Sequence, residues 1–154
     1  MVRAMDLTIL RRVTEELIPF NKFLGVRVLV LEVGRVELLI PWREELLGDA
    51  MRPAMHGGVI STLADTAGGV CLWGALENPE ARISTIDLRV DYLRPGRAEG
   101  LIAEARVVRV GRAVGVTEMS LFHALPSGAR SELVATGKGV YAIKTPHAPP
   151  ALRQ

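Results

Sequence analysis

The stretch Met55–Leu76 constrains this chain most, because it is apolar over the length of a long helix and carries a single carboxylate. It opens with His56-Gly57-Gly58 and has Asp65 near its middle. An apolar run of this length exceeds an ordinary strand and predicts a buried helix over residues 57–76. The rest of the chain must then supply a surface that covers this helix.

At about 100° per residue, the predicted helix sorts its side chains into two faces. One face is apolar and is expected to lie against a sheet; it comprises Ile60, Leu63, Ala67, Val70, Cys71 and Gly74. The other has only small residues; it comprises Gly57, Ser61, Ala64 and Gly68. Two explanations of the small residues stay open. They allow a second helix to approach closely, most simply a copy of the same helix across a two-fold axis, or they fit beneath a tight sheet.

The remaining segments show one helical pattern and several strand patterns. The chain order predicts a helix at Asp6–Ile18 with Asp6 as N-cap and Pro19 as its stop, a hairpin of Gly25–Val33 and Arg35–Trp42, a loop at Arg43–Ala54, and strands at Arg82–Leu93, Ala98–Val110, Val114–Leu125 and Glu132–Lys144. Sequential long strands with short turns imply an antiparallel sheet. We therefore predict one α+β domain over residues 1–154, with an N-terminal helix within 1–20, a curved antiparallel sheet wrapped around one long central α-helix, and a loose tail over 145–154.

The strand predicted at Arg82–Leu93 alternates between apolar and polar residues. Ser84, Ile86, Leu88, Val90 and Tyr92 are expected on one face, and the intervening residues 85, 87, 89 and 91 on the other. This alternation predicts a strand with one buried face.

Composition excludes several classes of function. The net charge is +2 and aromatic residues are 5%, so a nucleic-acid partner has little support. The longest apolar run contains Asp65, and the charged N-terminus does not resemble a signal peptide, so we expect a cytoplasmic protein without a membrane partner. Cys71 is expected to be a small buried hydrophobe. His123 and His147 lie apart from Cys71, and no metal site is predicted.

The helix start and Asp65 offer complementary chemistry. Gly57 and Gly58 leave backbone N–H groups unshielded at a positive helix end, where a carbonyl oxygen that gains charge would be stabilised. Asp65 can serve as a general base for water, or as a nucleophile. It lies eight residues beyond Gly57, or about 12 Å along the axis. If both groups serve one substrate, Asp65 must come from a second, antiparallel chain, with a two-fold axis near Ser61.

Four motifs together resemble the hotdog-fold thioesterases, specifically the phenylacetate-pathway (PaaI-like) acyl-CoA thioesterases, over about residues 20–145. They are His56-Gly57-Gly58, Leu63-Ala64-Asp65-Thr66-Ala67, Asp91-Tyr92-Leu93-Arg94-Pro95 and Gly111-Arg112. The resemblance implies hydrolysis of an acyl-CoA to a carboxylic acid and free coenzyme A, which is part of the substrate, with no cofactor. It also implies a homodimer as the minimum active unit and a dimer of dimers as the assembly.

The resemblance assigns roles to individual residues. Asp65 would be the catalytic carboxylate, and the Gly57 N–H would polarise the thioester carbonyl. His56 would position the loop or contact the substrate near the thioester. Thr85 falls near a position where relatives have a Ser or Thr that helps to hold the attacking water; the adjacent Ser84 is the alternative.

Other positions are less constrained by the resemblance. Arg94 and Arg112 are either solvated turn residues or partners for a coenzyme A phosphate, since arginine pairs well with phosphate. Ala50 stands where many relatives have Asn, which puts an Asn-assisted role in doubt. Trp73 and Tyr92 are expected in the core rather than in the wall of an acyl pocket. A non-catalytic acyl-CoA-binding or ligand-sensing module is the alternative function.

Overall fold

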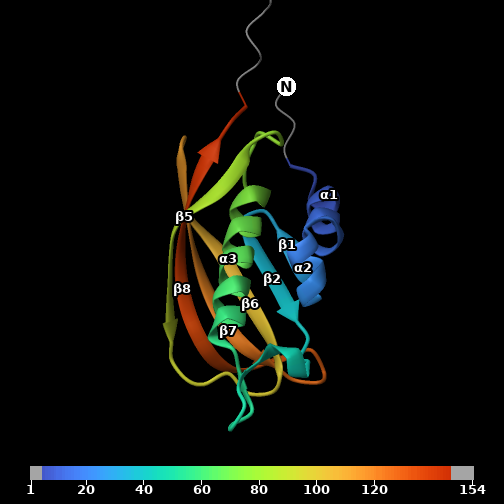
Figure 1. Cartoon of the computed structure of the whole chain (residues 1–154). Coiled ribbons are helices and arrows are strands. Elements are labelled where there is room, and N and C mark those ends of the chain that lie inside the picture. The colour runs from blue at the N-terminus through green and yellow to red at the C-terminus, as the bar shows by residue number, and fades with distance from the viewer. Residues whose placement is uncertain (1–4, 147–154) are drawn as a thin grey trace, which may run out of the picture.

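The computed structural model describes residues 5–146 and confirms the α+β architecture. A long helix, α3 (Gly57–Gly74), lies against one face of a six-stranded antiparallel sheet in the order β1-β2-β6-β7-β8-β5 (Figure 1). Its strands are β1 (Arg27–Glu32), β2 (Arg35–Ile40), β5 (Arg82–Tyr92), β6 (Gly100–Val110), β7 (Val114–Ala124) and β8 (Arg130–Lys144). The predicted loop at residues 43–54 contains a short 3-10 turn, η2 (Glu44–Leu46), and a small two-stranded sheet of β3 (Leu47–Asp49) and β4 (Ala54–Met55).

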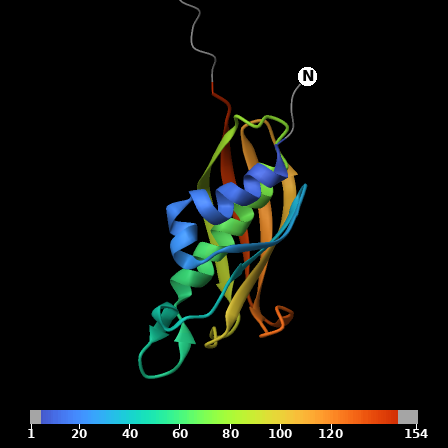
Figure 2. The same cartoon turned by 90° about the vertical axis from the view of Figure 1, so that its right-hand side faces the viewer.

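The N-terminal segment forms three short helical pieces rather than one helix. They are α1 (Leu7–Arg12), a π-helical turn η1 (Val13–Leu17) and α2 (Pro19–Leu24). Asp6 caps α1 as predicted, since its carboxylate accepts from the Thr8 and Ile9 N–H groups at 2.8 and 3.3 Å. Pro19 ends the first helical segment but also begins α2, because proline suits the first position of a helix. These pieces cover one side of the molecule, beside β1 and α3 (Figure 2).

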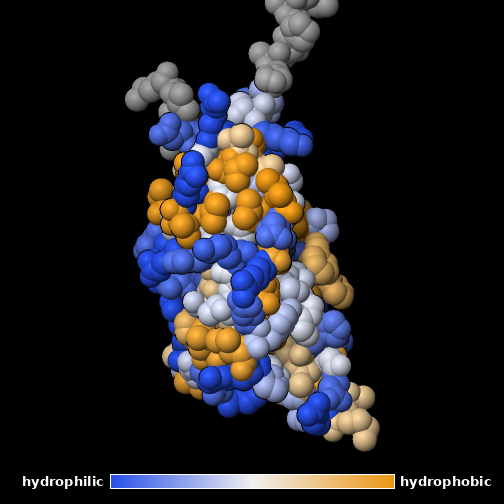
Figure 3. Space-filling model, turned by 90° about the vertical axis from the view of Figure 1, so that its left-hand side faces the viewer, coloured by the Kyte–Doolittle hydropathy of each residue, from blue (hydrophilic) through white to orange (hydrophobic). Residues whose placement is uncertain are grey.

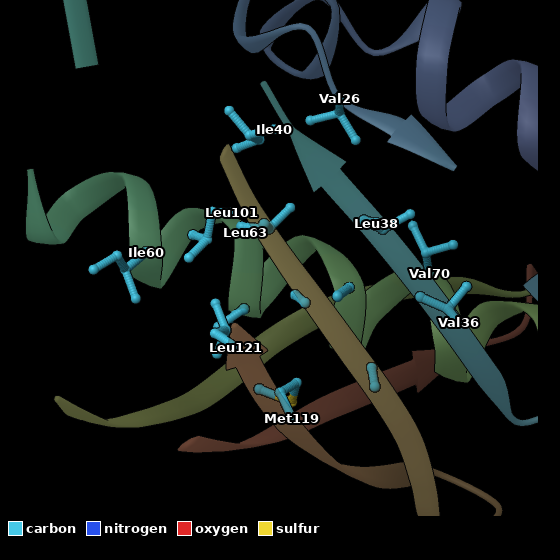
Figure 4. Packing of buried hydrophobic residues seen from close by; sticks show 14 of the residues in the cluster. Val26, Val36, Leu38, Ile40, Ile60, Leu63, Val70, Leu101, Met119 and Leu121 are labelled. Atoms are coloured by element: carbon cyan, nitrogen blue, oxygen red, sulfur yellow. The ribbon is translucent and has the colours of Figure 1, made fainter. Parts of the chain in front are cut away.

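The apolar face predicted for α3 forms the centre of the core. All six of its predicted members are buried. They meet inward side chains of the sheet such as Leu38, Leu101 and Leu121, none of which is exposed (Figure 4). Burying each large aliphatic side chain stabilises the fold by about 1.5–3 kcal/mol, so this interface fixes α3 on the sheet.

The stripe of small residues on α3 faces the sheet over part of its length. Ala64 and Gly68 are buried, and a methyl group at Gly68 would lie 2.3 Å from Tyr141 Oη and 2.6 Å from Thr117 Oγ1. A second helix therefore cannot contact these two residues, and the fit beneath a tight sheet explains them. The open face of α3 is formed by residues other than Ala64 and Gly68. These exposed or half-exposed residues are Gly58, Ser61, Thr62, Asp65 and Thr66.

A β-bulge overturns the single buried face that was predicted for β5. Thr85 pairs with Tyr141 and Asp87 pairs with Val140, so Ile86 is an extra residue, and its side chain is 58% exposed. Before the bulge, Thr85 faces α3 and bonds Asp65. After it, Leu88 and Val90 pack against the core.

Two further predictions concern the ends of the chain and the membrane. The tail prediction falls mainly on residues 147–154, which include His147 and lie outside the described residues. Within residues 5–146, no helix combines the length and the apolar character needed to cross a membrane.

Candidate active site

The start of α3 is organised by His56 as its N-cap. His56 Nδ1 accepts a hydrogen bond from the Gly58 N–H at 2.8 Å. The Gly57 N–H makes no hydrogen bond within residues 5–146. Of the two glycines predicted to offer a free donor, only Gly57 therefore keeps one, and the helix dipole adds positive potential at the same point.

Tyr92 holds the other side of this helix start. Its hydroxyl donates to the Gly57 carbonyl at 3.1 Å, and the residue is 52% exposed. The prediction that Tyr92 belongs to the core is therefore wrong. The Gly96 carbonyl accepts from the Met55 N–H at 2.8 Å, so the loop after β5 also fixes the backbone that leads into the helix.

Asp65 meets Thr85 on the open face of α3. The Thr85 hydroxyl donates to Asp65 Oδ1 at 2.9 Å. No donor among the described residues bonds the other carboxylate oxygen. The Tyr141 hydroxyl donates to the main-chain carbonyl of Asp65 at 3.1 Å, and burial raises the pKa of this phenol, which keeps it a hydrogen-bond donor.

A hollow of about 290 Å³ opens beside this pair. Polar groups of Asp65, Thr66, Ser84 and Thr85 form one part of its lining, Asn21 and Tyr141 add two further polar side chains, and the remaining side chains are apolar. The apolar part comprises Ile18, Val70, Trp73 and Ile83. A carboxylate and a hydroxyl at the edge of an apolar hollow are suited to a substrate that joins a polar reacting group to an apolar chain.

A second hollow, of about 410 Å³, lies at the start of α3. Gly57, Tyr92 and Arg94 are among its lining residues. The Arg94 guanidinium forms an exposed ion pair with Glu132. Arg112 lies apart, in the turn between β6 and β7, so one chain does not bring the two predicted phosphate partners together.

A third and larger hollow, of about 500 Å³, contains none of the predicted site residues. It lies on the outer face of the sheet, where a hydrophilic band crosses between two hydrophobic areas (Figure 3). Opposite charges in this band pair with one another, as Arg106 does with Glu104 at 3.2 Å and Arg89 with Asp91 at 3.0 Å. Size alone therefore does not identify the reactive site, and the chemistry favours the Asp65 hollow.

Sequence reasoning missed three contributors to the Asp65 hollow. Ile18 reaches the Asp65 hollow from the N-terminal segment, and Tyr141 reaches it from β8. Trp73 was expected in the core; it packs against core residues and also lines the hollow. Among residues 5–146, no group of three or more His, Cys, Asp or Glu side chains is arranged to hold a metal ion.

The fold defines a class of protein: an α+β protein of the hotdog type, with an apolar helix held in an antiparallel sheet. Residues 53–124 match the thioesterase superfamily. The chain is 44% identical over 124 residues to a Halobacterium salinarum protein named "putative esterase", and the match covers 79% of this chain and 82% of that protein. It is 36% identical over 115 residues to the medium/long-chain acyl-CoA thioesterase YigI of Escherichia coli, over 67% of this chain and 74% of that protein.

Solved structures agree with these relatives. A Shewanella oneidensis protein related to the thioesterase superfamily has a TM-score of 0.78 and 30% identity, and the match covers 90% of this chain and 95% of that one. A thioesterase from Haemophilus influenzae has a TM-score of 0.77 at 18% identity, covering 94% of both chains, and supports the fold alone. The chain belongs to the thioesterase superfamily of hotdog-fold proteins, and it is a thioester hydrolase. The narrower resemblance to the phenylacetate-pathway group stays a prediction.

Proposed function

We propose that this protein hydrolyses an acyl-CoA thioester, with Asp65 of one chain activating water against a carbonyl held at the Gly57 N–H of another. The observation that carries the proposal is the Asp65–Thr85 pair at the edge of an apolar hollow. The similarity to an acyl-CoA thioesterase of Escherichia coli supports coenzyme A as the leaving group.

The reaction needs few titratable groups. Thr85 occupies Asp65 Oδ1 and so orients the carboxylate, which leaves the second oxygen for a water molecule. Asp65 accepts a proton as the water oxygen adds to the carbonyl carbon, and the developing oxyanion is stabilised at the helix start. The carbon–sulfur bond then breaks, and the thiolate leaves without needing a strong general acid. No cofactor takes part, and His56 contributes by capping the helix.

The distance between Gly57 and Asp65 supports a site built from two chains. Gly57 and Asp65 are about 12 Å apart along α3, which is beyond the reach of a carboxylate side chain. An antiparallel partner across the open face of α3 would place each Gly57 beside the other chain's Asp65. We therefore propose a homodimer as the minimum active unit, pairing further into a dimer of dimers, and acting in the cytoplasm.

The first experiment measures thiol release from a panel of aliphatic and aromatic acyl-CoAs. Asp65→Asn is expected to lower kcat by at least a hundredfold while the oligomer stays intact by light scattering. Binding of acyl-CoA without turnover by the unmodified protein would favour the ligand-sensing alternative. Full turnover by Asp65→Asn would exclude this carboxylate as the base.

A second experiment tests the two-chain site. Gly57→Pro removes the proposed donor but suits the helix, because proline is favoured at the first helical position and His56 already has the extended backbone that must precede it. Gly57→Ala keeps the N–H and is the matched control, since its methyl group would be 3.5 Å from Tyr92. Mixing inactive Gly57→Pro and Asp65→Asn chains should restore about one quarter of the activity, because half of the dimers are mixed and each mixed dimer has one intact site. No recovery, in a mixture shown to exchange subunits, would place the whole site within one chain.

A further inference from the structure

The apolar part of the Asp65 hollow runs along α3 away from the carboxylate. Asp65, Gly69 and Trp73 follow one another at intervals of four residues, and all three line the hollow. Residues four apart lie on the same side of a helix, so the lining forms a continuous track. Gly69 in the middle of this track has no side chain to obstruct it.

The track ends at Trp73. Beyond it, α1 packs on the end of α3, because a methyl group at Gly74 would lie 3.2 Å from Leu10 and 3.5 Å from Leu7. Ile18 and Ile83 flank the hollow from η1–α2 and from β5. Trp73 is therefore the last residue of α3 that lines the hollow, one residue before the contact of α3 with α1.

We propose that Trp73 is the end stop of an acyl-chain channel and that it restricts the substrate to medium-length chains. This inference rests on the proposed acyl-CoA hydrolysis. The eight residues from Asp65 to Trp73 span about 12 Å. An extended chain advances about 1.2 Å per bond, as a polypeptide does over its three bonds per residue, so about eight to ten carbons fill the channel.

The indole is well suited to substitution because no polar contact depends on it. Trp73 Nε1 is buried and has no hydrogen-bond partner among the described residues. Shortening the side chain therefore removes no hydrogen bond between Trp73 and the described residues. The chain also offers a matched control in Trp42, which lines a separate hollow with Leu39 and Pro41.

The test is the dependence of kcat/KM on acyl length, from 4 to 16 carbons, measured by thiol release. The unmodified protein should have its optimum near eight to ten carbons. Trp73→Ala should move the optimum to longer chains and raise the ratio of kcat/KM for 14 carbons to that for 8 by about tenfold or more, the factor expected when the shortened side chain lets roughly two more methylenes be buried. Ile18→Trp should move the optimum to shorter chains, and Trp42→Leu should leave the profile unchanged.

Two outcomes overturn the end stop: an unmodified protein that favours 16 carbons, or a Trp73→Ala profile that coincides with that of Trp42→Leu. Should Trp73→Ala fail to fold, Trp73→Leu and Ile18→Trp provide the same comparison. If the unmodified protein releases no thiol from any substrate, the proposed function fails. The channel can then be tested separately from hydrolysis by calorimetric binding of S-alkyl-CoA thioethers of graded length. Affinities that do not depend on alkyl length would refute the channel.

Discussion

Two adjacent glycines of α3 should respond in opposite directions to the same added methyl group. At Gly69, the new methyl would lie 3.4 Å from Ile83 Cδ1 and 3.6 Å from Tyr141 Cε1, which are ordinary contacts. Gly69→Ala should therefore stabilise the protein by about 1 kcal/mol, the gain in helix propensity. At Gly68, the methyl would lie 2.3 Å from the Tyr141 hydroxyl oxygen.

The loss at Gly68 has two parts. Overpacking of a buried site costs about 1–3 kcal/mol. A Tyr141 hydroxyl pushed away from the Asp65 carbonyl is left buried and unpaired, which costs about 1–3 kcal/mol more. The gain in helix propensity offsets about 1 kcal/mol, so Gly68→Ala should destabilise the protein by about 1–5 kcal/mol.

Urea denaturation at one fixed protein concentration measures both variants, because the stability of an oligomer depends on concentration. Thermal unfolding should agree, with Gly69→Ala raising Tm by about 2–4 °C for a chain of this size. A Gly68→Ala variant as stable as Gly69→Ala would refute the packing of α3 against Tyr141. Adding Tyr141→Phe to Gly68→Ala should recover part of the loss, because it removes the nearer of the two oxygens that the methyl group would meet.

Two further predictions concern buried titratable groups. Burial and the neighbouring Arg97 lower the pKa of His123 from its ordinary value of 6.5, so the unfolded chain binds a proton at a higher pH than the folded chain does. The stability linked to neutral His123 should therefore be fully present above about pH 6.5 and should be lost as the pH drops towards the lowered pKa. Urea midpoints measured from pH 7.5 to 5 should decline more steeply for the unmodified protein than for His123→Phe. Equal slopes would contradict this. Burial also raises the pKa of Cys71 to about 12, so an aromatic disulfide reagent at pH 8 should label the thiol only as the protein unfolds, and rapid labelling of the folded protein would refute the burial.

The helix, the hairpin and most strand boundaries followed from local signals in the sequence. Asp6 is an N-cap, and Gly34 in the hairpin turn has a φ of +78°, a conformation that glycine adopts at little cost. Such signals act within a few residues and can be detected without knowledge of the fold. The separation of Gly57 from Asp65 could likewise be calculated from helix geometry alone.

The errors arose where distant segments decide the outcome. Nothing near Gly68 in the sequence indicates that Tyr141 will lie against it, so the sequence left open whether the small stripe faces a second helix or a tight sheet. The alternation of β5 is regular in the sequence, and the bulge at Ile86 is visible only in its pairing with β8. Tyr92 resembles a core residue until the start of α3 is placed beside its hydroxyl.

The extra residue in β5 has a consequence for comparing this chain with its relatives. Thr85 contacts the carboxylate before the bulge, whereas Leu88 and Val90 contribute to the core after it. A relative that lacks the bulge would be one residue shorter here while keeping both functions. Aligning the two sequences without a gap would then offset one half of the strand and pair the hydroxyl with an unrelated side chain. Placing a one-residue gap at Ile86 keeps the half of the strand that contacts Asp65 and the half that packs against the core in correspondence.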